Sequence, residues 1–146
     1  MDNAKLDGLI HHHQPFAVYG RQALTFFNWL GVTYYLTRDE VFATLGAIAN
    51  VAPSGSMVIF DYLDTDAFVP EKVDPLVLAM QQGAQQVGEP MKAGFNPAAL
   101  ATDLAGLGLR LEENLSPTNI EERYFKGRTD NYHALKHFNF ACVVVE

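Results

Sequence analysis

The chain has 146 residues, 49% of them hydrophobic, and a formal net charge of -7. This length and composition predict one globular domain with a sizeable core rather than two domains. The acidic balance argues against a nucleic-acid-binding surface, which needs clustered Lys and Arg. The single cysteine, Cys142, rules out an internal disulfide. No apolar run approaches the ~20 residues of a membrane span, and the first residues lack the pattern of a secretion signal. We therefore expect a cytoplasmic protein.

Residues 1–23 are polar and are expected to form an irregular N-terminal segment, ahead of an α/β domain over residues 24–146. The unusual feature of this segment is the run His11, His12 and His13. Side chains of adjacent residues point in different directions and rarely complete a metal site without distant ligands. A solvated loop is therefore the favoured interpretation, with a metal or functional site as the alternative.

The first predicted elements form a strand–helix–strand unit. An apolar run over residues 24–32 predicts a strand buried on both faces. Thr37 and Glu40 then have the spacing of a capping box, which predicts a helix starting there and ending near residue 53. Residues 57–60 predict a second buried strand. Such a unit is the building block of a parallel sheet.

The middle of the chain predicts two helices separated by loops. Residues 61–64 are expected to open a polar connection after the second strand. Asp74 and Pro75 form an N-cap and first-turn pair for a modest helix. Asn96 and Pro97 are expected to start a better helix, whose leucines lie on one face.

The C-terminal third predicts two more strands. Apolar and charged side chains alternate over residues 109–112, as in a strand with one solvent-exposed face. Residues 119–125 predict a short helix, and residues 138–145 predict a final buried strand. His133 and His137 have helical spacing but no acidic residue at a fitting distance in sequence. They predict a half-exposed helix rather than metal ligands. Together the elements predict an α/β layered domain with one antiparallel strand.

Several motifs follow one another in a recognisable order. They are FFNWLGVTYYLT at 26–37, SMVIFDY at 56–62, GEP at 88–90, FNPAAL at 95–100, LGL at 107–109, SP at 116–117 and ERYF at 122–125. Together they resemble the C-terminal half of a class I S-adenosylmethionine-dependent methyltransferase, nearest to the leucine carboxyl methyltransferase-like family. The resemblance covers about residues 24–146. It implies a partial Rossmann-like sheet, formed from the family's fourth to seventh strands, with helices on both faces.

The resemblance also implies S-adenosyl-L-methionine as the cofactor. In the family, the cofactor lies mainly on the first half of the sheet, at a glycine-rich turn and an acidic ribose-binding residue. Gly8 and Gly20 precede the first predicted strand, but neither lies in a strand–turn–helix context. Leu30 stands where related members often carry a glutamate beside the cofactor, so Leu30 and Gly31 mark its expected position. The cofactor is therefore expected to bind this chain alone weakly or not at all.

Five residues are candidates for substrate binding. Tyr35 follows the first predicted strand and Asp61 and Tyr62 follow the second, at the sheet end where ligands bind. Their alternative role is structural, as core caps or turn residues. Glu89 lies in the family-like Gly-Glu-Pro loop, and Arg123 is placed to pair with a carboxylate, either Glu89 or a substrate. A surface salt bridge is the alternative for this pair. The pattern indicates no metal site beyond the histidines already named.

Two functions remain open from the sequence. The first is the substrate-side half of a small-molecule O-methyltransferase, completed by an N-terminal half on another polypeptide. The second is a non-catalytic dimerising or binding module that keeps the fold.

The strand edge at residues 26–36 is expected to be uncovered, because in the family's sheet the first strand lies beside the fourth. These residues include no charged residue and no proline that would protect such an edge. We expect a homodimer through this edge, or a cover from residues 1–23.

Overall fold

The computed structural model describes residues 23–146, so the histidine run at residues 11–13 lies outside the described residues. Within the described part, four strands form one open sheet in the order β1-β2-β4-β3. The strands are β1 (Phe26–Trp29), β2 (Met57–Leu63), β3 (Leu109–Leu115) and β4 (Phe138–Val145). β1 is parallel to β2, whereas β4 is antiparallel to both of its neighbours. The predicted α/β class with an antiparallel strand is confirmed.

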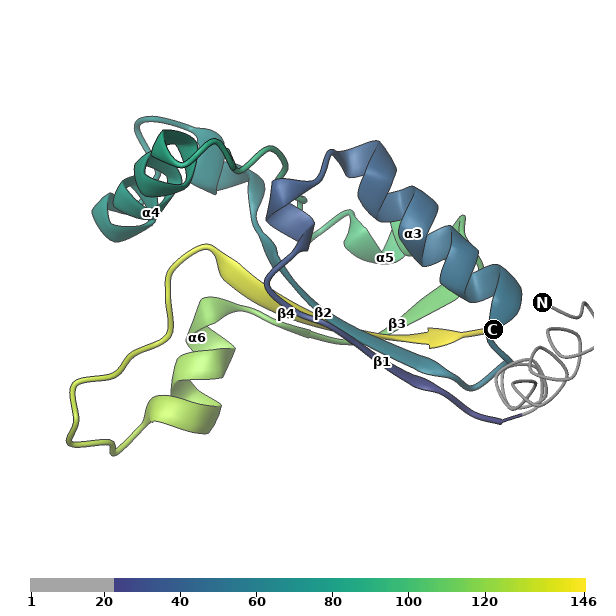
Figure 1. Ribbon diagram of the computed structural model, residues 1–146. Helices are drawn as coiled ribbons and strands as arrows, with labels where there is room; N and C mark the ends of the chain where they lie inside the picture. Colours follow the sequence, from purple (N-terminus) through teal and green to yellow (C-terminus); the bar gives the residue numbers. More distant parts are fainter. Residues whose placement is uncertain (1–22) are drawn as a thin grey trace, which may run out of the picture.

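Helices lie on both faces of this sheet (Figure 1). α3 and α5 cover one face, and α6 lies against the other, while α4 lies beyond the end of β2. The α-helices are α3 (Arg38–Val51), α4 (Pro75–Gln86), α5 (Leu100–Ala105) and α6 (Pro117–Ile120). Three short helices of other types complete the described elements: the 3₁₀ helices η1 (Thr33–Tyr35) and η2 (Thr65–Phe68), and the π-helix η3 (Glu121–Phe125). No helix in residues 23–146 has the length and apolar character that a membrane crossing requires.

α3 begins as its capping box predicts. The Thr37 N–H donates to Glu40 Oε2 at 2.7 Å, and the Glu40 N–H donates to Thr37 Oγ1 at 3.3 Å. These two bonds satisfy backbone donors that the first turn of a helix otherwise leaves without partners. The helix then buries Val41 and Leu45 in the core against the sheet. The predicted strand–helix–strand unit is therefore confirmed.

The main core lies between the sheet and the α3–α5 layer. Alternate residues of β2 point into it, because successive strand side chains face opposite sides of a sheet. Phe60 and Tyr62 are fully buried there, and Phe60 is paired in register with Ala141 of β4. Phe95 packs edge-to-face on Tyr62 with ring centroids 6.0 Å apart. Hydrophobic burial on this face is the main stabilisation of the described domain.

The opposite face of the sheet is only partly covered, and this overturns one prediction. β1 was expected to be buried on both faces, but Phe26 is 60% exposed and Asn28 is also exposed. β1 has β2 as its only strand neighbour among the described residues, so it is an edge strand. A run of aromatic and β-branched residues reports strand propensity, whereas burial depends on what lies beside the strand.

Three further boundaries differ from the prediction. Residues 61–63 continue strand β2 instead of opening a loop. α5 starts at Leu100, because the Asn96 side chain accepts from the Ala98 N–H at 3.0 Å and closes a separate turn first. Residues 131–137 form no helix, since Asn131 and His137 have φ angles of 59° and 68°. Non-glycine residues with positive φ cannot continue a right-handed helix.

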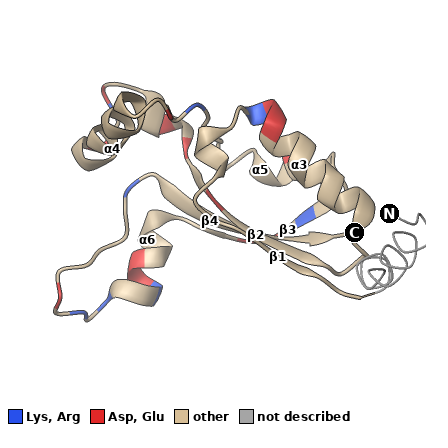
Figure 2. Cartoon of the chain, viewed as in Figure 1, with Lys and Arg blue, Asp and Glu red and all other residues tan. Residues whose placement is uncertain are grey.

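The exposed edge of β1 generates the first testable prediction. Figure 2 shows no charged residue on this strand, and native proteins usually protect sheet edges with charge, proline or cover. When the chain is isolated, we expect two copies to pair along this edge, and Phe26→Lys to weaken that pairing because it places a charge there. Sedimentation velocity at high micromolar concentration measures the association.

Leu76→Lys is the matched control, because Leu76 is similarly exposed, at 57%, but lies on α4. We expect this control to associate as the wild type does. A wild-type monomer with fast amide exchange along residues 26–29 would contradict edge pairing.

Candidate functional site

The turn after β1 is tied to β2 by two hydrogen bonds to one residue. Gly31 has a φ of 75°, a conformation that glycine adopts without strain, and its N–H donates to Asp61 Oδ1 at 2.7 Å. The buried Thr33 hydroxyl donates to the Asp61 backbone carbonyl at 2.5 Å. Together these bonds fix η1 against β2 at the end of the parallel pair, which is where ligands bind in open α/β sheets.

Asp61 is a buried carboxylate within strand β2, and its side chain lies on the less covered face. Burial raises the pKa of this carboxyl group above its ordinary value, although the hydrogen bond from the Gly31 N–H acts in the opposite direction. An ionisable group with a pKa shifted by burial, placed next to a cavity, is typical of functional sites. Asp61 is therefore a buried ionisable group at the end of the parallel strands, next to the cavity described below.

Tyr34 lies beside Asp61 and is held by its neighbours. Its ring meets Phe138 edge-to-face with centroids 5.5 Å apart. Burial, followed by the nearby charges of Asp61 and Tyr35, raises the pKa of Tyr34 to about 12. The Tyr34 hydroxyl therefore keeps its proton at neutral pH and can act as a hydrogen-bond donor.

A cavity of about 520 Å³ opens beside these two residues. Phe138 and Phe140 of β4 form its floor, and Phe140 is the strand partner of Asp61. The remaining lining comes from Tyr34, Met80, Ile120, Phe125, Tyr132, His133, Ala134 and Leu135. The cavity is thus apolar and aromatic with a few polar groups, which is typical of small-molecule sites.

The sequence-predicted residues are divided among different places. Asp61 lines this cavity, whereas Tyr35 and Glu89 line a second cavity of about 590 Å³, together with Lys92. Tyr62 is fully buried in the main core, and its hydroxyl donates to Asn114 Oδ1 at 2.8 Å. Tyr62 therefore lies in the core, on the face opposite Asp61.

Arg123 does not pair with Glu89. Its guanidinium contacts Glu113 of β3 at 2.7 Å, and both side chains are about half exposed. This is the surface salt bridge of the alternative interpretation, and such pairs contribute little to stability. Leu30 is 42% exposed in the turn after β1, next to Gly31, so no acidic side chain occupies that position.

Two histidines gain carboxylate partners that sequence spacing did not reveal. His133 Nδ1 lies 2.9 Å from Glu121 Oε1, and the Ala134 N–H donates to Glu121 Oε2 at 2.8 Å. The hydrogen bond from His133, followed by that from Ala134, lowers the pKa of Glu121. Glu121 is separated from His133 by a turn and a loop, so only the fold brings the pair together.

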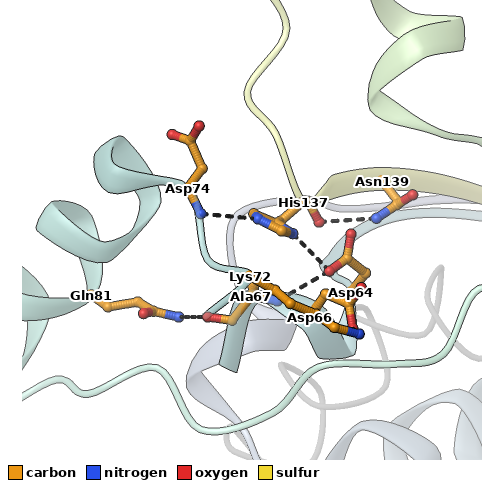
Figure 3. A network of polar contacts seen from close by, with 8 residues as sticks. All are labelled: Asp64, Asp66, Ala67, Lys72, Asp74, Gln81, His137 and Asn139. Carbon is orange, nitrogen blue, oxygen red and sulfur yellow. Dashed lines mark hydrogen bonds and ion pairs between the residues drawn. The ribbon is translucent and has the colours of Figure 1, made fainter. Parts of the chain in front are cut away.

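His137 joins three segments through the network shown in Figure 3. The Asp74 backbone N–H donates to His137 Nε2 at 3.1 Å, so this nitrogen carries no proton. Nδ1 therefore holds the proton and donates to Asp64 Oδ1 at 2.9 Å. The Asn139 side-chain amide donates to the His137 carbonyl at 2.9 Å. The start of α4, the end of β2 and the start of β4 are thereby fixed around one imidazole.

Among residues 23–146, no group of three His, Cys, Asp or Glu side chains is arranged to hold a metal ion.

Comparison with known proteins adds one curated relative. The chain is 35% identical over 120 residues to the protein named "Putative S-adenosyl-L-methionine-dependent methyltransferase YktD" of Bacillus subtilis (strain 168). The chain is therefore similar in sequence to part of a protein named as a putative S-adenosyl-L-methionine-dependent methyltransferase. The match covers 82% of this chain but only 40% of the relative's length. No family model matches the chain.

Solved structures of low identity share the fold. A DUF574 family protein from Streptomyces avermitilis aligns with a TM-score of 0.62 at 11% identity, covering 100% of this chain and 53% of that protein. The mitomycin 7-O-methyltransferase MmcR aligns with a TM-score of 0.54 at 13% identity, covering 86% of this chain and 31% of that protein. These likenesses confirm the mixed α/β fold. The leucine carboxyl methyltransferase-like subfamily stays a prediction.

Asp61 generates a prediction about stability and pH. The pKa of Asp61 is higher in the folded state than its value of about 3.9 in the unfolded state. The free energy of unfolding therefore falls as the pH rises from the unfolded pKa to the folded pKa. Asp61→Asn removes the buried charge, and its amide oxygen can still accept from the Gly31 N–H. We therefore expect the variant to be at least as stable as the wild type at neutral pH, with the difference disappearing in acid. Urea denaturation at several pH values measures this. A variant that is less stable by the same amount at every pH would contradict it.

The His137 network generates a second stability prediction. His137→Ala removes the acceptor of the Asp74 N–H and the partner of Asp64, so we expect a loss of about 1–3 kcal/mol in the free energy of unfolding. His133→Ala is the matched control, because the His133 side chain is 69% exposed and should change stability little. Equal effects of the two substitutions in urea denaturation would refute the network's structural role.

Proposed function

We propose that this chain is the substrate-side part of an S-adenosyl-L-methionine-dependent small-molecule O-methyltransferase of the leucine carboxyl methyltransferase-like type. The observation that carries the proposal is the apolar cavity beside Asp61, at the end of the parallel strands β1 and β2. The relationship to a protein named as an S-adenosyl-L-methionine-dependent methyltransferase supports the reaction class. The fold shared with an O-methyltransferase is compatible with it.

The cavity favours a small apolar, hydroxylated acceptor. Its volume of about 520 Å³ lies within the range of roughly 300–1,000 Å³ that suits small molecules. Phe125, Phe138 and Phe140 offer aromatic surface for a ring, and Tyr34 offers a hydrogen-bond donor. Methyl transfer requires an acceptor oxygen held in line with the methyl donor, and rigid aromatic walls supply such positioning.

The described residues do not by themselves fit the methyl donor. Residues 23–146 contain neither a glycine-rich turn after a strand nor an acidic residue in place of Leu30. We propose that a complementing N-terminal half supplies those groups and lies along the edge of β1. The exposed Phe26 on that edge supports this arrangement.

We do not favour a non-catalytic binding module, because the curated relative is named as a methyltransferase. The sequence encoded directly upstream of the chain separates the two ideas. Strands and a glycine-rich turn encoded there would favour a divided or longer enzyme. A different upstream protein would favour the module.

The proposal predicts the response of the isolated chain to the cofactor product. Titration calorimetry with S-adenosylhomocysteine should give weak or undetectable heats, because the expected cofactor groups are absent from the described residues. The same titration after adding the complementing half should give stoichiometric binding. Tight binding by the isolated chain, at about micromolar or better, would overturn the assignment of the cofactor site to another segment.

A further inference from the structure

One histidine in the wall of the candidate acceptor cavity is paired with a glutamate. His133 lines the cavity, and its Nδ1 lies 2.9 Å from Glu121 Oε1. Glu121 is itself oriented by the Ala134 N–H, which donates to its second oxygen at 2.8 Å. The carboxylate is thus fixed on both oxygens, and these bonds favour its charged form.

The pair defines which nitrogen of His133 is available. An ionised carboxylate can only accept hydrogen bonds, so Nδ1 carries a proton; in the uncharged imidazole this leaves the lone pair on Nε2. Within residues 23–146, no hydrogen bond to His133 Nε2 is found, and the side chain is 69% exposed. This is the arrangement of a general base, in which a second group orients the imidazole and the other nitrogen stays open.

The other polar groups of the cavity are less suited to accept a proton. The Tyr34 hydroxyl, with a pKa of about 12, retains its own proton at neutral pH. One Asp61 oxygen is already engaged by the Gly31 N–H at 2.7 Å. Tyr132 also lines the cavity but carries a phenol, which is an acid rather than a base in its ordinary state. His133 is therefore the side chain of the cavity that offers an imidazole nitrogen as a proton acceptor.

We propose that His133 Nε2 accepts the hydroxyl proton of a hydroxyaromatic compound bound in this cavity, with Glu121 as its positioning residue. This inference rests on the proposed function and names its acceptor class. The O–H bond breaks and an Nε2–H bond forms, leaving a phenolate beside an imidazolium. The Glu121 carboxylate balances the imidazolium charge. The aromatic ring of the ligand packs on Phe138 and Phe140.

The experiment uses para-nitrophenol as the probe, because its phenolate absorbs visible light and its phenol does not. The chain is titrated into the probe slightly below the pH at which the free probe ionises. We expect wild-type binding to increase the phenolate absorbance. His133→Gln should bind the probe about tenfold more weakly, because it loses one charge-assisted hydrogen bond. The same variant should abolish the absorbance change. Glu121→Gln should reduce the absorbance change by weakening the orienting contact.

Glu122→Gln is the matched control, because Glu122 is exposed on the same turn and lines a different depression. It should behave as the wild type does. Binding of para-nitrophenol with the same affinity and absorbance to the wild type and His133→Gln would overturn this inference and leave the acceptor cavity standing. Absence of binding to the wild type would overturn both. Circular dichroism confirms folding, and His133→Asn provides a second variant with the same expectation.

Discussion

The geometry of the candidate site depends on how Asp61 connects the two parallel strands. Its side chain accepts from the Gly31 N–H and its backbone carbonyl accepts from the Thr33 hydroxyl. These bonds anchor the turn after β1 to β2, next to Tyr34, whose ring packs on Phe138 beside the cavity. The cost of this arrangement is a buried carboxylate, whose pKa is raised because burial disfavours its charge. Proteins commonly keep such a group where function requires it.

The two histidines of the C-terminal loop carry out separate tasks. His137 is largely buried and holds the end of β2, the start of β4 and the start of α4 in one network. His133 is exposed at the cavity wall and is oriented by Glu121. One imidazole therefore stabilises the loop, and the other is available to a ligand.

Much of the fold could be predicted from local sequence. The capping box at Thr37 and Glu40 and the cap formed by Asp74 depend on neighbouring residues, so sequence spacing is enough to find them. The burial of β1 could not be predicted, because strand propensity does not say what lies beside a strand. The polar Asp61 predicts a loop over residues 61–64, whereas residues 61–63 continue β2 with the Asp61 side chain on the less covered side of the sheet.

The site was harder to predict than the fold. Asp61 was found from its position after an apolar run, but Tyr62, one residue later, points to the opposite face and into the core. The carboxylate partners of His133 and His137 are 12 and 73 residues away in sequence, so no local pattern reveals them. Glu89 and Arg123 likewise lie at different depressions of the surface. Long-range pairing of this kind appears only once the chain is folded.

The central claim is that the cavity beside Asp61 binds the methyl acceptor. Nuclear magnetic resonance mapping of the isolated chain with phenol tests it most directly, because phenol carries only the ring and hydroxyl that the cavity is proposed to recognise. The account predicts amide shift changes concentrated at residues 120–125, 132–135 and 138–140. Changes concentrated instead at Tyr35 and residues 88–92, which line the second cavity, would contradict it.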